Sequence, residues 1–325
     1  MRILFAGSPA IAIPSLKAIF DLEEEGRGFT LAGLLTNGDS RRGRGSSLEP
    51  TEVSAAASEL SQQRQEAGRP PLVQLKPTAL DASFRKEAAA LKADLLVSFA
   101  YGRIFGPKFL SLFSRGGINL HPSLLPLYRG ASPIQAAILN QDTETGVCIQ
   151  KLAEKMDRGD ILSKEVIKLQ GDETALSLSQ KVAEISARLL RETLLGFDRL
   201  QKEARPQEGP ASYCSQIKKE EGLINWNKSA ADICAQVRAF LPWPLAYTRR
   251  GTETLYLLEA GASDAEAEAA TMPGTVMGLD PDRGILIQTG KGLLEVRRLQ
   301  WGGKKALPWK DFCNGTRNFT GSTLG

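Results

Sequence analysis

Two polar side chains, Asn119 and His121, stand at the end of an apolar run and could do chemistry together. Residues 118–120 are predicted to end a buried strand, and positions two apart on a strand point to the same face. Pro122 and Pro126 then stop regular structure and stiffen the following loop. An amide and an imidazole can each donate a hydrogen bond to a developing oxyanion. The pattern therefore predicts a polar site at the carboxyl end of a parallel sheet.

Asp157 is the third candidate for this site, and it lies 36 residues after His121. It follows a predicted helix and a predicted strand, so we expect a crossover connection to return it to the same edge of the sheet. A carboxylate beside an imidazole can orient the ring, bias its protonation or accept a proton itself. Ser123 is the one nearby hydroxyl, but it lacks the G-x-S-x-G pattern of a nucleophile elbow. The set therefore favours acyl transfer in which a substrate amine is the nucleophile.

Length and composition restrict the class of protein. With 325 residues, 42% hydrophobic and 24% charged, the chain has the size and balance of two soluble globular domains. It has no run of about 18 apolar residues, so we expect no membrane span. Four widely spaced cysteines and a single histidine argue against a disulfide framework, a zinc cluster or a multi-histidine metal site. We therefore expect a metal-free protein of the reducing cytoplasm.

The order of the predicted elements indicates a Rossmann-like α/β domain. Strands are predicted at 3–6, 29–36, 72–75, 94–99, 116–120, 145–152 and 161–169, and helices at 11–22, 52–66, 81–93, 133–140 and 174–201. Ser132 is expected to cap the helix that begins at Pro133. Strands that alternate with helices are typical of a mostly parallel sheet. Neither G-x-G-x-x-G nor G-x-x-x-x-G-K-[ST] occurs, which disfavours dinucleotide and Walker-type phosphate binding.

The pattern changes after a polar, proline-containing segment, which we predict to be a linker. One helix at 230–240 is followed by short strand-like runs between glycines, at 254–258, 274–277, 284–289 and 292–299. Such spacing suggests a small β-barrel. We therefore expect a catalytic domain at 1–201, a linker at 202–218 and a second domain at 219–325.

Two basic segments point to a polyanionic partner. Residues 36–47 contain three arginines and no apolar residue, so we expect a mobile surface loop. This loop follows a strand and therefore leaves the same edge of the sheet as the loop after His121, where arginines suit phosphate contacts. From Arg283 to the end, eight Lys or Arg residues stand against two acidic ones. The alternative interpretation is a solvated surface with a chance imbalance of charge.

Residues 119–126, followed by Arg129 and Gly130, resemble the signature of the folate-dependent formyltransferases. Residues 131–135 resemble the methionyl-tRNA formyltransferases in particular. Further segments resemble the same family at 5–9, 43–45, 100–102, 156–160, 218–221, 224–226, 238–244 and 302–306, so the resemblance spans nearly the whole chain. It implies transfer of the formyl group of 10-formyltetrahydrofolate to the amine of methionine esterified to initiator tRNA, in translation initiation.

The resemblance also implies roles for individual residues. Asn119 and His121 would stabilise the oxyanion, and Asp157 would orient His121 and assist removal of a proton from the amine. The implied folate-binding positions are Phe99, Ala100, Tyr101, Gly102, Ser123, Leu124, Leu125 and Pro126. The implied tRNA-binding positions are Arg41, Arg42, Arg44, Lys304 and Lys305. An OB-like second domain, a monomer, and the absence of a metal and of membrane contact are implied as well.

Two segments depart from the family pattern. Where the family usually reads Leu-Asp-Thr-Gly, this chain has Met156-Asp157-Arg158-Gly159, so an arginine follows the carboxylate. Where the family often reads Gln-Pro-Asp-Arg, the chain has Asn-Gly-Asp-Ser at 37–40, so we expect a less rigid arginine loop.

Other functions remain open from the sequence. A sugar-nucleotide formyltransferase would share the folate site and could also have a small second domain, although the arginine loop and the basic final segment favour tRNA. A phosphoribosylglycinamide formyltransferase needs only the first domain. A catalytically silent RNA-binding or folate-sensing protein is a different class, and the intact set of Asn119, His121 and Asp157 argues against it.

Overall fold

The computed structural model describes residues 1–41, 47–263 and 271–325. Its contacts divide the chain into two compact units, and each is described by itself. The first unit comprises Met1–Ala131, Thr145–Lys168 and Ser179–Cys214, and the second comprises Ser132–Glu144, Leu169–Leu178 and Ser215–Gly325. Within the described ranges, no helix is long and apolar enough to cross a membrane.

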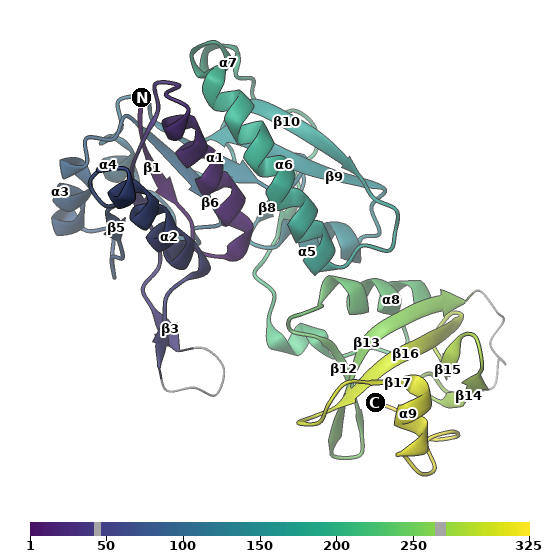
Figure 1. Ribbon diagram of the computed structural model, residues 1–325. Coiled ribbons are helices and arrows are strands. Elements are labelled where there is room, and N and C mark those ends of the chain that lie inside the picture. Colours follow the sequence, from purple (N-terminus) through teal and green to yellow (C-terminus); the bar gives the residue numbers. More distant parts are fainter. Residues whose placement is uncertain (42–46, 264–270) are drawn as a thin grey trace. The chain divides into compact units, whose positions relative to one another are not determined.

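The first unit is built on a seven-stranded sheet with the order β10-β9-β7-β6-β1-β2-β5 (Figure 1). The strands are β1 (Arg2–Ala6), β2 (Thr30–Leu35), β5 (Gln74–Leu75), β6 (Leu95–Phe99), β7 (Gly117–His121), β9 (Glu144–Lys151) and β10 (Ile161–Lys168). From β5 through β7 all neighbouring strands are parallel. Nearly every residue of β1, β2 and β6 is buried, as in sheets covered on both faces. The α/β domain with a mostly parallel sheet is therefore confirmed.

Helices connect and cover these strands. They are α1 (Ile13–Glu24), α2 (Glu52–Glu66), α3 (Ala82–Ala90), α4 (Pro107–Leu110), α6 (Ala175–Leu195) and α7 (Phe197–Glu203), with a 3₁₀ turn η1 (Ala10–Ala12) before α1. Two of them begin at side-chain caps: the Thr51 hydroxyl accepts from the Ser54 amide at 3.1 Å, and the Asp81 carboxylate accepts from the Phe84 amide at 2.9 Å. Such caps satisfy amides that the first helical turn leaves without partners.

The second unit has its own antiparallel sheet, with the order β12-β13-β16-β15-β14 and with β17 paired to β16. Its strands are β12 (Ala246–Arg250), β13 (Glu253–Ser263), β14 (Val276–Asp280), β15 (Gly284–Gln288), β16 (Leu293–Trp301) and β17 (Leu307–Pro308). Its helices are α5 (Pro133–Leu139), α8 (Ala230–Ala239) and α9 (Trp309–Asn314), with a 3₁₀ turn η2 (Lys219–Gly222). Helix α8 packs on β13 and on α5, over a core that includes Trp226, Ile233 and Phe312. A separate antiparallel second domain is confirmed.

Some local predictions were wrong. The single helix expected at 174–201 is two helices, because the chain leaves helical geometry at Gly196. Segment 36–47 was expected to be a mobile surface loop; its described part includes the short strand β3 (Ser40–Arg41), which pairs antiparallel with β4 (Leu48–Glu49), and residues 42–46 lie outside the described residues. Ser132 is the N-cap residue of α5, as expected, but its side chain makes no capping hydrogen bond. Strand β12 was missed because its sequence, Ala-Tyr-Thr-Arg-Arg, has no apolar run.

Candidate active site

The carboxyl ends of β1, β2, β6 and β7 meet at one edge of the first unit's sheet, because these strands are parallel. Asn37, which follows β2, joins three of these ends. Its side-chain amide donates to the Ser8 hydroxyl, after β1, and to the Tyr101 carbonyl, after β6, both at 3.0 Å. These hydrogen bonds hold the segments after β1, β2 and β6 together next to the end of β7, where the candidate residues lie.

Asn119 lies in β7, opposite Ser98 of β6 and Gln150 of β9. Its side chain is half-buried. In the described part of the chain, the Asn119 amide group has no hydrogen-bond partner. A partly buried amide N–H without a partner is available to a substrate oxygen. Asn119 can therefore act as the oxyanion donor that the sequence predicted.

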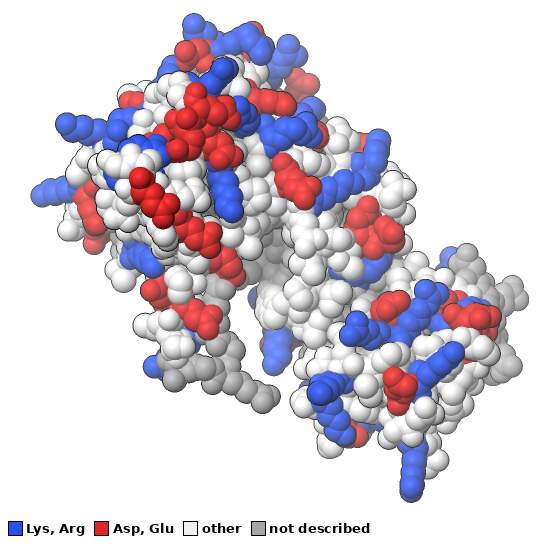
Figure 2. All heavy atoms as spheres, in the orientation of Figure 1, with Lys and Arg blue, Asp and Glu red and all other residues white. Residues whose placement is uncertain are grey.

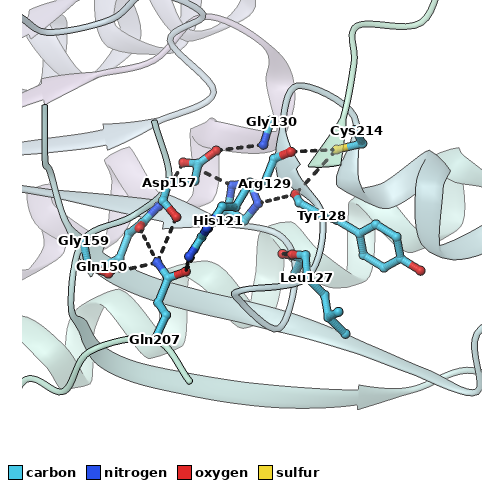
Figure 3. Close-up of polar contacts among 11 residues, drawn as sticks. His121, Leu127, Tyr128, Arg129, Gly130, Gln150, Asp157, Gly159, Gln207 and Cys214 are labelled. Carbon is cyan, nitrogen blue, oxygen red and sulfur yellow. Dashed lines mark hydrogen bonds and ion pairs between the residues drawn. The ribbon is translucent and has the colours of Figure 1, made fainter. Parts of the chain in front are cut away.

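His121 ends the same strand and is 3% exposed. Its Nε2 lies 2.8 Å from the Tyr128 carbonyl oxygen, which can only accept, so Nε2 carries the proton and donates (Figure 3). The lone pair on Nδ1 of the neutral ring then faces Asp157 Oδ1 at 3.6 Å. Burial holds the pKa of His121 below its usual value, although the Asp157 charge and the Tyr128 carbonyl oppose part of this shift. The free imidazole is therefore neutral at pH 7.

Asp157 is held by both carboxylate oxygens. Oδ2 accepts from the Gly130 amide and Oδ1 accepts from the Gln150 side chain, each at 2.9 Å. The Asp157 backbone has φ of 53°, a conformation that few residues other than glycine adopt. The Asp157 side chain is 10% exposed. The structure thus brings Asn119, His121 and Asp157 to one place.

The route by which Asp157 reaches His121 differs from our expectation. Strand β9 runs antiparallel to β7 and pairs its last residue, Lys151, with Ile118, so it ends beside the start of β7. The predicted crossover was therefore wrong, because strand direction is not encoded in hydrophobic periodicity. The loop 152–160 instead folds back along β9, with the Lys151 amide donating to the Asp160 carbonyl at 2.9 Å. A Cβ at Gly159 would lie 1.8 Å from the Lys151 carbonyl oxygen, so this approach requires glycine.

The loop after His121 is packed from within. The Ser123 side chain is fully buried and its hydroxyl donates to the Leu127 carbonyl at 2.6 Å, which leaves no free nucleophile there. Gly130 has φ of 119°, and a Cβ there would lie 2.1 Å from the Cys214 carbonyl oxygen. The loop geometry therefore depends on glycine at the position whose amide binds Asp157.

The residues expected to bind folate differ in how far their side chains are exposed. The side chains of Phe99, Tyr101, Ser123, Leu125 and Pro126 are buried, and the Tyr101 ring stacks on Phe105 with centroids 5.3 Å apart. Ala100 and Gly102 are exposed, and Leu124 is half-buried. Residues 99–102 and 123–126 can therefore contact a ligand chiefly through backbone groups.

The residues expected to bind tRNA belong to different units. Arg41 is exposed in β3 of the first unit, whereas Arg42 and Arg44 lie outside the described residues. Lys304 and Lys305 are exposed between β16 and β17 of the second unit. Figure 2 shows basic side chains at several places on the visible face of the second unit, with acidic side chains between them.

Sequence reasoning missed several residues of the site. Gln150 is 2% exposed and lies opposite Asn119. A glutamine at the end of the apolar run Val-Cys-Ile was the available signal. Gln207 and Tyr213 belong to the segment expected to be a linker, and nothing in their local sequence indicated contact with a site. Among the described residues, no group of His, Cys, Asp and Glu side chains is arranged to hold a metal ion.

Arg158, the residue that departs from the family pattern, contacts Tyr213. Arg158 Nη2 donates to the Tyr213 hydroxyl at 2.7 Å, and Arg129 Nη1 donates to the same hydroxyl at 3.2 Å. The hydrogen bond from Arg129, followed by the bond and charge of Arg158, lowers the pKa of the Tyr213 phenol. Two guanidinium groups thus share one phenol beside the Asp157 loop.

We expect Arg158→Ala to raise the pKa of Tyr213 toward its ordinary value, because one donor and one nearby positive charge are removed. Ring-labelled tyrosine followed by NMR from pH 8 to 11 measures this, with Tyr213→Phe assigning the resonance. Lys155→Ala, a change of equal charge in the same loop, should leave the titration in place. A Tyr213 titration that Arg158→Ala does not move would contradict the contact.

Comparison with known proteins identifies the class. The formyl transferase family model matches residues 1–194, and the model of the formyl transferase C-terminal domain matches residues 216–317. The chain belongs to the formyl transferase family. Methionyl-tRNA formyltransferase of Treponema denticola is 46% identical over 98% of each chain, and that of Treponema pallidum is 38% identical over 100% of this chain and 99% of the relative.

Solved structures share the fold at lower identity. WlaRD, a sugar 3N-formyl transferase, superposes with a TM-score of 0.62 at 17% identity and covers 94% of this chain and 99% of its own. HypX from Aquifex aeolicus, in complex with tetrahydrofolic acid, superposes with a TM-score of 0.60 at 17% identity over 99% of this chain and 48% of its own. At these identities the likeness concerns the fold alone.

Proposed function

We propose that the chain transfers the formyl group of 10-formyltetrahydrofolate to the free amine of initiator methionyl-tRNA. The observation that carries this proposal is the convergence of Asn119, His121 and Asp157 in a chain 46% identical, over nearly its full length, to a protein named for this activity. The set contains a free amide donor and a proton acceptor, and the nearby hydroxyl is engaged inside its own loop. Such a site suits attack by a substrate amine rather than by the enzyme.

In the proposed mechanism the three side chains have different roles. The amine nitrogen attacks the formyl carbon, and the Asn119 amide donates to the oxygen that becomes negative. The Asp157 carboxylate and the free Nδ1 of His121 face each other, and together they accept the proton that the amine loses. Because His121 Nε2 already donates to Tyr128, a proton at Nδ1 gives an imidazolium whose charge also stabilises the oxyanion.

The second half of the reaction returns the proton. The bond between the formyl carbon and the folate nitrogen breaks, and that nitrogen takes the proton held by His121 and Asp157. Atoms and charge then balance: one C–N bond forms, one breaks and one proton moves. Backbone groups at residues 99–102 and 123–126, whose larger side chains are mostly buried, would hold the folate.

Acceptor choice tests the proposal directly. Purified protein with 10-formyltetrahydrofolate is offered initiator methionyl-tRNA, elongator methionyl-tRNA and dTDP-linked amino sugars. We expect formylmethionine on the initiator tRNA and at most slow reaction with the sugars. Formylation of an amino sugar without formylation of methionyl-tRNA would establish the alternative, a sugar N-formyltransferase.

The arginine segment is proposed to contact tRNA. Replacing Arg41, Arg42 and Arg44 together with alanine should raise KM for methionyl-tRNA about tenfold or more and leave KM for folate within about twofold, because phosphate contacts supply much of the affinity. The matched control replaces three exposed lysines, Lys86, Lys108 and Lys202. An equal rise in both KM values, or the same rise in the control, would remove the segment from tRNA recognition.

The remaining parts of the proposal concern the domains and the setting. The catalytic domain is assigned to 1–201 and an OB-like tRNA-binding domain, with Lys304 and Lys305, to 219–325. The protein would act as a cytoplasmic monomer in translation initiation, away from membranes and without a metal. Four free cysteines support a reducing compartment.

A further inference from the structure

Residues 205–214, inside the segment expected to be a linker, are hydrogen-bonded to both loops of the candidate active site. Arg205 and Ile161 exchange backbone hydrogen bonds of 2.8 and 3.1 Å. The Ser212 amide donates to the Pro126 carbonyl at 3.2 Å, and the Ser212 carbonyl accepts from the Arg129 amide at 2.9 Å. Strand β11 (Tyr213–Cys214) then pairs parallel with β8 (Arg129–Gly130). This segment is therefore part of the first unit's site.

Gln207 makes the central side-chain contacts of this segment (Figure 3). Its Oε1 accepts from Arg129 Nε at 3.1 Å and Nη2 at 2.6 Å. Its Nε2 lies 2.8 Å from the Asp157 carbonyl, 2.9 Å from the Gly159 carbonyl and 3.2 Å from Gln150 Oε1. A guanidinium only donates and carbonyls only accept, so the amide can have only this orientation. With two hydrogens for three acceptors, one N–H is shared.

Each group that holds Asp157 is either bound by Gln207 or adjacent to a residue that Gln207 binds. Gln150 Oε1 accepts from Gln207, which turns Gln150 Nε2 toward Asp157 Oδ1 at 2.9 Å. Gly130, whose amide binds Asp157 Oδ2, directly follows the arginine that Gln207 holds. Gln207 also binds the backbone carbonyl of Asp157, whose positive φ is unfavourable for a residue with a side chain and persists only where its surroundings hold it. Loss of Gln207 would therefore weaken the support of both carboxylate oxygens and of the Asp157 backbone.

We propose that Gln207 is a positioning residue for formyl transfer: it ties Arg129, Gln150 and the 157–159 loop together and so holds the Asp157 carboxylate against His121. The inference rests on the proposed function of this site. Gln207 touches Asp157 only through the backbone carbonyl and contacts His121 only through intermediates. Its effect is therefore on the geometry of the proton acceptor.

The first test compares Gln207→Ala with Gln201→Ala, a glutamine whose side chain also donates to a backbone carbonyl of the first unit, that of Arg115 at 3.1 Å. We expect Gln207→Ala to lower kcat about 10- to 100-fold, since misplacing a catalytic group by about 1 Å can cost about 10²-fold. KM for folate and for methionyl-tRNA should stay within about threefold. Wild-type kcat in Gln207→Ala would overturn the proposal.

Two further variants locate the effect. Gln207→Glu keeps an acceptor for Arg129 but sets an oxygen against three acceptors, so kcat should fall as far as in Gln207→Ala. Near wild-type kcat in this variant would show that Arg129 alone matters and would overturn the role proposed for Asp157. In an Asp157→Asn background, adding Gln207→Ala should lower kcat by less than about threefold, because residues that act through one another are not additive. Full multiplication of the two losses would overturn the link.

An independent readout needs no acceptor. His121 is the single histidine, so ¹⁵N-histidine labelling gives one imidazole spectrum. We expect Gln207→Ala to shift the Nδ1 resonance at pH 7, because the facing carboxylate moves, and Gln201→Ala to leave it in place. An unshifted resonance in Gln207→Ala would overturn the proposal. If the wild type formylates no methionyl-tRNA, the proposed function fails while this comparison still decides the role of Gln207.

Discussion

We expect His121→Ala to lower the single-turnover rate of formyl transfer to methionyl-tRNA by about 10³-fold or more. The change removes the ring nitrogen that faces Asp157 and, in the proposed mechanism, the positive charge that forms beside the oxyanion. Losing general acid–base help alone costs about 10²–10⁴-fold, and losing oxyanion stabilisation costs about 10²–10³-fold. Quench-flow with labelled formyl donor, at saturating concentrations of both substrates, measures the rate of transfer.

A control separates chemistry from packing. Cys148 lies opposite His121 in β9 and is buried, and burial raises the pKa of its thiol to about 11, so it is a neutral neighbour at pH 7. Cys148→Ala should keep the transfer rate within about threefold, although cavity formation lowers stability by about 1–2 kcal/mol. If Cys148→Ala were as slow as His121→Ala, or if His121→Ala kept its rate, the role of the imidazole would be refuted.

We expect Asp157→Asn to lower the transfer rate by about 10²–10³-fold. The asparagine keeps the shape of the side chain and an oxygen for the Gly130 amide, but it has lost the charge and the ability to accept a proton. Its remaining amide group would also meet the Gln150 donor, a repulsive contact. The same quench-flow experiment applies, with the melting temperature recorded for each variant.

Asp160→Asn provides the comparison for this second variant. Asp160 ends the same loop, pairs with Lys151 at 3.1 Å and has a side chain 40% exposed, so its loss removes a solvent-screened ion pair of about 0–1 kcal/mol. The transfer rate should remain within about twofold. An Asp157→Asn enzyme as fast as Asp160→Asn would mean that the proton leaves by another route.

Much of the architecture could be predicted because it depends on local patterns. The parallel strands of the first unit are short apolar runs between helices, and the antiparallel second domain follows from strands separated by glycines. The placement of Asn119 and His121 on one face needed only the period of a strand. The break between α6 and α7 was not predicted because Gly196 lies within an otherwise continuous helical pattern.

The residues that hold Asp157 in place, Gln150 and Gln207, could not be predicted, because their roles depend on contacts between segments distant in sequence. Asp157 was correctly expected to lie near His121, but the expected connection was wrong. Strand β9 runs antiparallel to β7, and the loop 152–160 brings Asp157 back to His121. Gln207 lies 50 residues from the Asp157 carbonyl that it binds. A polar, proline-containing segment has the same composition whether it is a free linker or is hydrogen-bonded to a site.

We propose that Asn119, His121 and Asp157 act together in the transfer of a formyl group to the amine of methionyl-tRNA. One measurement addresses it: the single-turnover transfer of labelled formyl to tRNA-bound methionine by the wild type and by the combined variant Asn119→Ala, His121→Ala and Asp157→Asn. We predict formylmethionine with the wild type, and a loss in the combined variant close to that of the most damaging single change, as for residues that act as a unit. Labelled formyl absent from methionine with the wild type, or present at an equal rate with the combined variant, would contradict this mechanism.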